Sequence, residues 1–415
     1  MRLRSREAVA VISLAIIVVY ALGYQAEKVQ SVPDFGAFYS VARAVLHGGL
    51  PALHHLYQMA FQIRADSIFS HGPHRAFWVP FVDMPTALLP LAPFALLPFT
   101  WAWALWDGLG LLACAGGVYW LARQQGLGAD ALPLALAVTA GYPTFMALVE
   151  GQYDLLLPLC LALITAAWYS GQRWRRWLQA MGAAFLFSFK PDLLLLAVVP
   201  AVAAWRRPLV RVALACLVLL GLACLALVGL PGLLHLPSLE YYTLFHRFPP
   251  TFDQTVLGFL WQLSGGRSWA SLGAYLALAL AASLLALAWW RNPPRTQTDW
   301  LLALTTTVCL SLVVAPHALS HDMILLAGPA IWTAAALRRS GRDLSWLALW
   351  MCLLNLLLLL HTLPLELLPV PLFPFGLLGA AVAAWRARTN LQAGSDLSAV
   401  PRRRAFEKAV PLSLP

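Results

Sequence analysis

The chain has 415 residues, of which 60% are hydrophobic and only 11% are charged. Soluble domains carry about 25% charged residues, so this composition excludes an ordinary soluble protein and indicates one that crosses a membrane several times. A net charge of +10 is compatible with nucleic-acid binding. The basic residues, however, stand in short clusters between apolar runs, as in loops that set membrane topology, so no nucleic-acid partner is expected.

Twelve apolar runs are read as membrane spans, several of them short enough to be broken or tilted. The first follows three arginines and shows no clear cleavage site, so we expect a retained signal anchor. The expected spans lie near residues 8–24, 100–121, 129–148, 152–169, 177–190, 191–204, 209–230, 269–290, 299–315, 322–337, 345–361 and 372–385. Residues 1–386 are thus expected to form one membrane domain, followed by a disordered cytoplasmic tail at 387–415.

The arginines decide the expected orientation of this domain. With the N-terminus inside, most basic residues fall in cytoplasmic loops, as the positive-inside rule requires. Two large loops, at about 25–99 and 231–268, then lie outside. Residues 77–99 carry five prolines, which interrupt the hydrogen bonds of a helix, so we expect a re-entrant or interfacial segment there on the outer side.

The stretch between two arginine clusters, at 173–176 and 206–207, is too short for two ordinary spans. Because both clusters favour the cytoplasm, two short helices are expected to cross and return, with Lys190 at the outward tip. A single long tilted span is the alternative. Lys190 itself is either a lysine that extends its ammonium group to the membrane surface or a cation that binds a phosphate at headgroup level.

Asp34 is the acidic residue that follows the first apolar run. The apolar residues after it have the spacing of one helix face, at Phe35, Phe38, Tyr39, Ala42, Val45 and Leu46. Aspartate is a favoured helix N-cap, and a carboxylate at the membrane surface can also act as a base on a substrate that is partly lipid. The two roles are compatible.

The other candidate site residues are polar groups that this topology places at the outer membrane boundary, where ionisable side chains are usually functional. These groups include Glu150, and those assigned to substrate binding, besides Lys190, are Gln152, Asp83, Asp154, Asp322 and Arg247. Tyr39, on the helix that begins at Asp34, is also assigned to substrate binding. The run from Gly151 to Asp154 could equally be a plain turn between spans. His317 and His321 are four residues apart, but the glutamate of a zinc helix is missing, so neither a metal nor another cofactor is expected.

Several short motifs, in their order and spacing, resemble glycosyltransferase family 87 between about residues 5 and 340. They are Asp34-Phe35 with Tyr39 and Ala42, His47-Gly48-Gly49, Leu56-Tyr57, the proline-rich run 84–93, Gly151-Gln152, Phe189-Lys190-Pro191, and Pro316 with His321-Asp322. One departure concerns Asp83, which stands where the family more often has a tyrosine and paired prolines. Asp83 is therefore a candidate second acid, and the choice of acceptor stays open.

The resemblance implies the all-α, multispan fold of class C glycosyltransferases. It further implies transfer of a sugar, with mannose expected, from a polyprenyl-phosphate donor to a lipid or glycan acceptor. By the same resemblance, Asp34 would be the general base, and Lys190 with His321 would contact the donor phosphate. We expect a multi-pass protein of the plasma (inner) membrane, in contact with membrane lipids, with its site facing the periplasm or exterior.

A transporter is the main alternative, and a lipid-carrier-binding protein without transferase activity is another. Transporters typically combine internal repeats with charged residues at the membrane midplane. The two halves of this chain show no evident repeat, and its polar residues cluster at the predicted outer boundary. The sequence therefore favours an enzyme.

Overall fold

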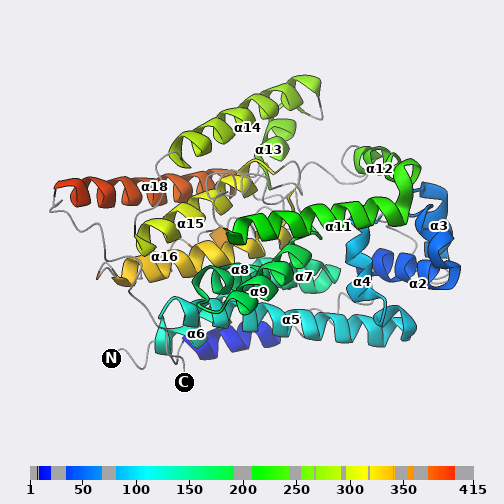
Figure 1. Ribbon diagram of the computed structural model, residues 1–415, viewed down its shortest axis with the longest axis horizontal. Coiled ribbons are helices and arrows are strands. Elements are labelled where there is room, and N and C mark those ends of the chain that lie inside the picture. The colour runs from blue at the N-terminus through cyan, green and yellow to red at the C-terminus, as the bar shows by residue number, and fades with distance from the viewer. Residues whose placement is uncertain are drawn as a thin grey trace.

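All of the regular structure in the described part of the chain is helical, which confirms the predicted all-α class. The computed structural model describes residues 7, 9–19, 34–67, 81–190, 208–242, 254–265, 268–290, 296–315, 318–339, 341, 351, 354–356, 358 and 373–397. Figure 1 shows α5 (Phe99–Gln124), α11 (Pro208–Leu233) and α15 (Gln297–Val313) along the long axis of the molecule. Helices α2 (Asp34–Leu53) and α3 (Met59–Ser67) gather at one end.

Two helices among the described residues are long and apolar enough to cross a membrane. They are α5 and the Leu214–Leu233 part of α11. A third is added if the bent pair Gly128–Thr139 and Tyr142–Glu150, with a 55° bend, is one broken span. The chain is thus a helical membrane protein, and the predicted number of about twelve spans stays a prediction.

The remaining helices largely coincide with the apolar runs of the sequence. The longer ones are α8 (Leu157–Tyr169), α9 (Arg173–Phe187), α14 (Trp269–Trp290), α16 (Ala327–Arg339) and α18 (Phe373–Leu397). The shorter ones are η3 (Gly128–Asp130), α6 (Ala131–Thr139), α7 (Tyr142–Glu150), η4 (Tyr153–Leu156), α12 (Leu236–Tyr242), α13 (Val256–Leu263) and η8 (His321–Leu326). Helix α18 continues beyond residue 386, where we expected the membrane domain to end. The expected span 191–204 lies outside the described residues.

The proline-rich segment forms short helical turns and no span within residues 81–98. These turns are η1 (Pro85–Ala87), α4 (Leu88–Leu91) and η2 (Phe94–Leu96). Thr86, Leu88 and Leu91 are buried, and α4 and η2 pack against α2. The prolines therefore fold this part of the chain back against the helix that begins at Asp34.

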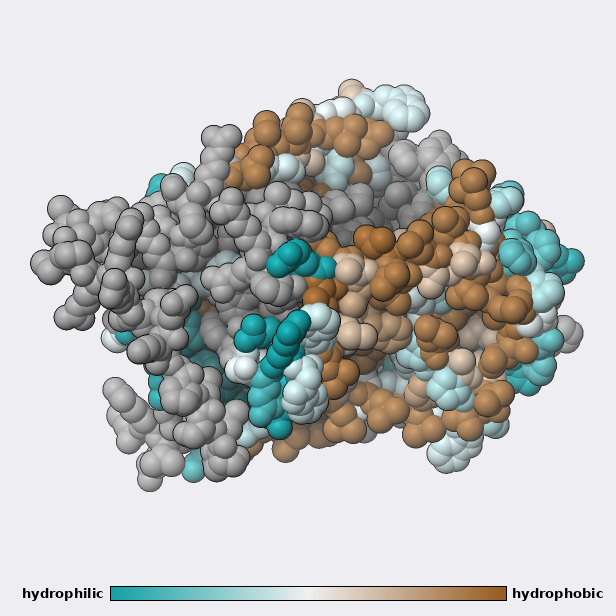
Figure 2. Space-filling view, viewed as in Figure 1, coloured by the Kyte–Doolittle hydropathy of each residue, from teal (hydrophilic) through white to brown (hydrophobic). Residues whose placement is uncertain are grey.

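Large apolar side chains cover the outward faces of α11 and α14. Figure 2 shows this as brown surface over both helices, in the same view as Figure 1. The exposed residues include Val218, Leu219 and Leu222 on α11 and Leu276, Leu280 and Leu284 on α14. Contiguous apolar surface of this kind is unfavourable in water and is typical of a protein surrounded by lipid.

Helix α5 belongs to both of the large hydrophobic cores. Its first half, with Trp103 and Trp106, packs into a core built around α2 and the proline-rich segment. Its second half, with Val118 and Leu121, packs into a core built with α8, α15 and α16. A single continuous helix, α5, therefore connects the core around α2 with the core of the central helices.

An arginine cluster, with Arg338 and Arg339 from the end of α16, lies at the C-terminal end of α5. Arg338 Nη1 donates to the Leu127 carbonyl at 2.8 Å and pairs with Asp130, and Arg339 donates to the Gln125 carbonyl at 3.3 Å. An α-helix rises 1.5 Å per residue, so Arg123 lies about 25 Å along α5 from Trp106. The arginine cluster and the Trp106 end of α5 are thus at opposite ends of the helix layer.

Candidate functional site

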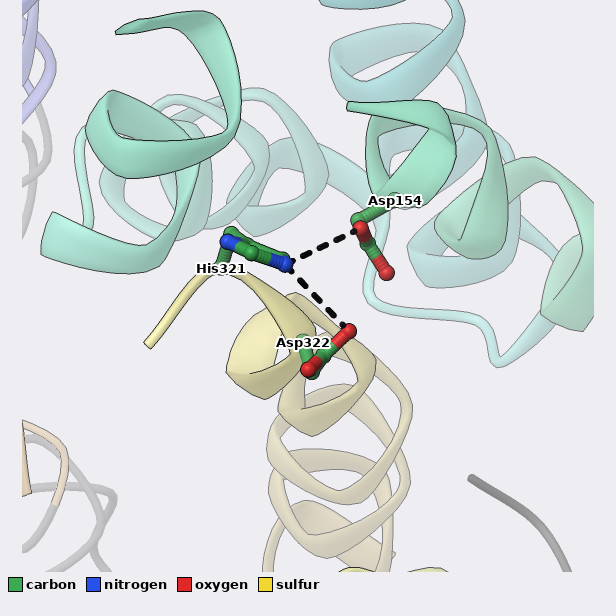
Figure 3. A group of neighbouring side chains, drawn as sticks. All are labelled: Asp154, His321 and Asp322. Atoms are coloured by element: carbon green, nitrogen blue, oxygen red, sulfur yellow. Dashed lines mark ion pairs between the residues drawn. The ribbon is translucent and has the colours of Figure 1, made fainter. Parts of the chain in front are cut away.

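Four separate parts of the chain meet in one polar cluster. They are the first residue of α2, the turn from α7 through η4, the residues after α9, and η8. Figure 3 shows Asp154 facing His321 and Asp322 across the gap between these elements. The side chains that meet here are Asp34, Glu150, Gln152, Asp154, Lys190, His321 and Asp322.

Asp34 is held by a glutamine. The Gln152 side-chain amide donates to Asp34 Oδ2, and Gln152 is almost fully buried. Asp34 stands in the first turn of α2, where the helix dipole favours a negative charge. Asp34 therefore starts the helix and accepts from Gln152 through Oδ2. Its other carboxylate oxygen can still take part in chemistry.

Gly151 makes the approach of Asp34 to Gln152 possible. It ends α7 in the left-handed conformation, with φ of 68°, and its carbonyl accepts from Trp106 Nε1 at 2.9 Å. A Cβ at this position would lie 2.5 Å from the Cβ of Phe35, the residue next to Asp34. Only glycine fits both the backbone conformation and the close packing.

Gly151→Ala is therefore expected to destabilise the protein by about 1–3 kcal/mol, since the added methyl group must displace Phe35. The chemistry of the site should be impaired as well, because Asp34 moves with Phe35. Thermal unfolding in detergent measures the first effect. Gly116→Ala in α5 is the matched control, because nothing lies within 4 Å of its added Cβ. Equal unfolding temperatures of the two variants would contradict this account.

Lys190 joins two buried carboxylates. Its Nζ lies 2.8 Å from Asp154 Oδ2 and 2.7 Å from Asp322 Oδ1, and these two side chains are 0% and 4% exposed. Asp322 Oδ2 also accepts from the Leu319 backbone amide at 2.6 Å. The carboxylate of Asp83 attracts the same ammonium group. An ammonium group has three protons, so one remains for a ligand after these two ion pairs.

Asp154, His321 and Asp322 also have the chemistry of metal ligands, with donor atoms within 4.8 Å of one another. His321 Nε2 lies 3.8 Å from Asp154 Oδ2 and 3.7 Å from Asp322 Oδ1, as the dashed lines in Figure 3 show. The ammonium group of Lys190, however, already bridges the two carboxylates. A divalent cation would have to displace it, so the donor set fits a lysine better than a metal.

The pKa of Asp34 is raised to about 7. Removal from water is the main cause, and the negative charge of Glu150 adds to it. The positive charges of His321 and Lys190, together with the Gln152 hydrogen bond, offset only part of this rise. A carboxylate that exchanges its proton near neutral pH is suited to general-base catalysis.

Not every predicted site residue lies in this cluster. The Tyr39 hydroxyl donates to the Leu97 carbonyl at 2.6 Å and accepts from Arg43 at 2.8 Å, and the ring is buried among aromatic residues. Arg247 lies outside the described residues. Glu150, one of the polar residues that the predicted topology places at the outer boundary, contacts His321 Nδ1. The sequence predicts no particular role for it.

Comparison with protein families matches residues 81–316 to glycosyltransferase family 87. No curated protein and no solved structure matches the chain significantly. The matched region includes Glu150, Gln152, Asp154 and Lys190, and the fold brings Asp34 and His321 to them from outside it. Because the match spans more than half of the 415 residues, the chain belongs to glycosyltransferase family 87 and is a glycosyltransferase.

Proposed function

We propose that this glycosyltransferase transfers a sugar, mannose in the first instance, from a polyprenyl-phosphate donor to a lipid or glycan acceptor, with Asp34 as the general base. The observation that carries the proposal is that a carboxylate base and a group of cations lie in one cluster. Asp34, held by Gln152, lies in the same cluster as the Lys190 ammonium group and His321. A base and a group of cations are what transfer from a sugar phosphate needs.

The reaction is a displacement at the anomeric carbon. Asp34 removes the proton of the acceptor hydroxyl while that oxygen forms a bond to the anomeric carbon. The bond from this carbon to the phosphate oxygen breaks, and its electron pair leaves with the polyprenyl phosphate. The remaining proton of Lys190 and the imidazole of His321 stabilise the departing phosphate. The donor carries its own leaving group, so the reaction requires no nucleotide.

Other polar groups of the cluster complete the proposed binding site. Gln152 orients Asp34, and its Oε1 is buried without a protein partner, so it can accept from a substrate hydroxyl. Asp154 Oδ1 is likewise buried and unpartnered. Asp322 fixes Lys190, and Asp83 is close enough to act on the same cation. Tyr39 supports the start of α2 from the aromatic core.

The proposed orientation follows from the two ends of the helix layer. The arginine cluster around Arg338 lies at one end of α5, and the site lies beside Trp106 at the other. Under the positive-inside rule the arginine end faces the cytoplasm. The site is then at the outer face of the plasma (inner) membrane, where a donor with its lipid chain in the bilayer can reach it.

The test is a transfer assay with the purified protein in liposomes. A radiolabelled polyprenyl-phosphate mannose is supplied together with a lipid extract as acceptor, and the expected result is a labelled glycolipid or glycan. A nucleotide-activated sugar is the control donor and should give no product. Labelled product from the nucleotide donor alone would overturn the proposal. Movement of a labelled solute across the liposome, without any transfer, would favour a transporter.

The rate should rise with pH through about 7. The base acts in its deprotonated form, and the pKa of Asp34 is raised from 3.8 to about 7. Below that value kcat/KM is expected to fall about tenfold per pH unit. The measurement is kcat/KM in liposomes between about pH 5.5 and 8.5. A flat profile over this range would show that the titrating base has an ordinary aspartate pKa.

A further inference from the structure

Glu150 is the carboxylate of the cluster to which no role has been assigned. It is the last residue of α7, and its Oε2 contacts His321 Nδ1. The His321 side chain is only 2% exposed, whereas that of Glu150 is 26% exposed. The contact therefore joins a nearly buried imidazole to a carboxylate that is still partly open to solvent.

This contact at Nδ1 also determines the hydrogen-bonding role of the other ring nitrogen of His321, Nε2. With Nδ1 held by Glu150, the opposite nitrogen, Nε2, faces Asp154 and Asp322 at 3.8 and 3.7 Å. The hydrogen bond at one ring nitrogen of a histidine decides what the other can do. A carboxylate at Nδ1 favours a proton there, and two more carboxylates favour a proton on Nε2. His321 is then a donor toward the space beside Lys190.

The position of Glu150 is itself rigid, because α7 is held at both ends by other helices. At its start, the Tyr142 amide donates to Asn355 Oδ1 at 3.0 Å. At its end, the Gly151 carbonyl accepts from Trp106 Nε1 at 2.9 Å. Pro143 in the first turn suits a helix start, and the break before it sets the 55° bend. A short, doubly anchored helix is a good support for a positioning side chain.

We propose that Glu150 is a positioning residue: it holds His321 as a hydrogen-bond donor toward the leaving phosphate, and its charge acts on Asp34 within the same cluster. This inference rests on the proposed transfer reaction. The groups that act on Asp34 are Glu150 from α7, Gln152 before η4, Lys190 after α9 and His321 from η8. The carboxylates of Asp154 and Asp322 in the same cluster are paired with Lys190, whereas the negative charge of Glu150 raises the pKa of Asp34, an effect second only to burial.

Two substitutions separate the two parts of the role. Glu150→Gln removes the charge but leaves an oxygen that can accept from Nδ1, whereas Glu150→Ala removes both. Glu150→Ala is expected to lower kcat/KM by about tenfold or more, and Glu150→Gln to retain more of the activity. In both variants the acid limb of the pH profile should move to lower pH. Asp130→Asn, which changes a carboxylate paired with Arg338 at the far end, is the matched control.

A second measurement does not depend on activity. Hydrophobic carbodiimides react with protonated carboxyl groups in membrane proteins, so labelling of Asp34 followed by mass spectrometry reports its proton as a function of pH. The labelling midpoint is expected near pH 7 in the wild type and at lower pH in Glu150→Gln, with no change in Asp130→Asn. Equal midpoints in the wild type and Glu150→Gln would overturn the inference. An inactive wild type with shifted midpoints would instead overturn the proposed reaction alone.

Discussion

Asp34→Asn is expected to reduce sugar transfer by about 10²–10⁴-fold or more, the range that one general base contributes. The asparagine has nearly the same shape, and its carbonyl oxygen can still accept from Gln152, so folding should be preserved. It cannot take a proton from the acceptor hydroxyl. The loss should therefore appear in kcat, with little change in the KM for the donor, when both are measured in liposomes.

The control for this experiment must be a carboxylate-to-amide change of the same size. Asp130→Asn meets this condition, because Asp130 pairs with Arg338 at the arginine end of the molecule. Its activity and unfolding temperature should be close to those of the wild type, apart from a small loss from the surface ion pair. Transfer by Asp34→Asn at the rate of Asp130→Asn would remove Asp34 from the role of base.

Lys190→Met is expected to impair both stability and activity. It leaves the buried carboxylates of Asp154 and Asp322 facing each other without their shared cation. Removing one partner of a buried ion pair costs about 3–5 kcal/mol, because the remaining charge stays buried and unpaired. Thermal unfolding in detergent should show this as a lower midpoint, and transfer should be lost because the leaving phosphate has lost its cation.

A triple variant separates these two effects. Lys190→Met combined with Asp154→Asn and Asp322→Asn removes the unpaired charges together with the lysine, so most of the lost stability should return. Activity should not return. A stable Lys190→Met variant would show that the ion pairs do not hold the folded protein together. Transfer by the triple variant would show that Lys190 does not act on the phosphate.

Part of the site could be predicted from the sequence because its residues are conspicuous there. Gln152, Asp154 and Lys190 are polar residues that interrupt apolar runs, and such residues are costly in a membrane unless they have a use. Glu150 lies in the same stretch and gives the same signal, but its role as a partner of His321 could not be predicted from the sequence. The motif that begins at Asp34 predicts substrate binding by Tyr39, whereas its hydroxyl donates to the Leu97 carbonyl at the edge of the aromatic core.

The sequence by itself determined the class of the protein. Apolar content and helix breaks at prolines and glycines are local properties, so they predict helices such as α5 and a turn at Gly151 without knowledge of the fold. Which side chains meet was decided only by the tertiary structure. Lys190 and Asp322 are 132 positions apart, and no local preference links them. Their pairing, and that of Glu150 with His321, follows from how the helices pack, because a buried charge is stable only where packing supplies its partner.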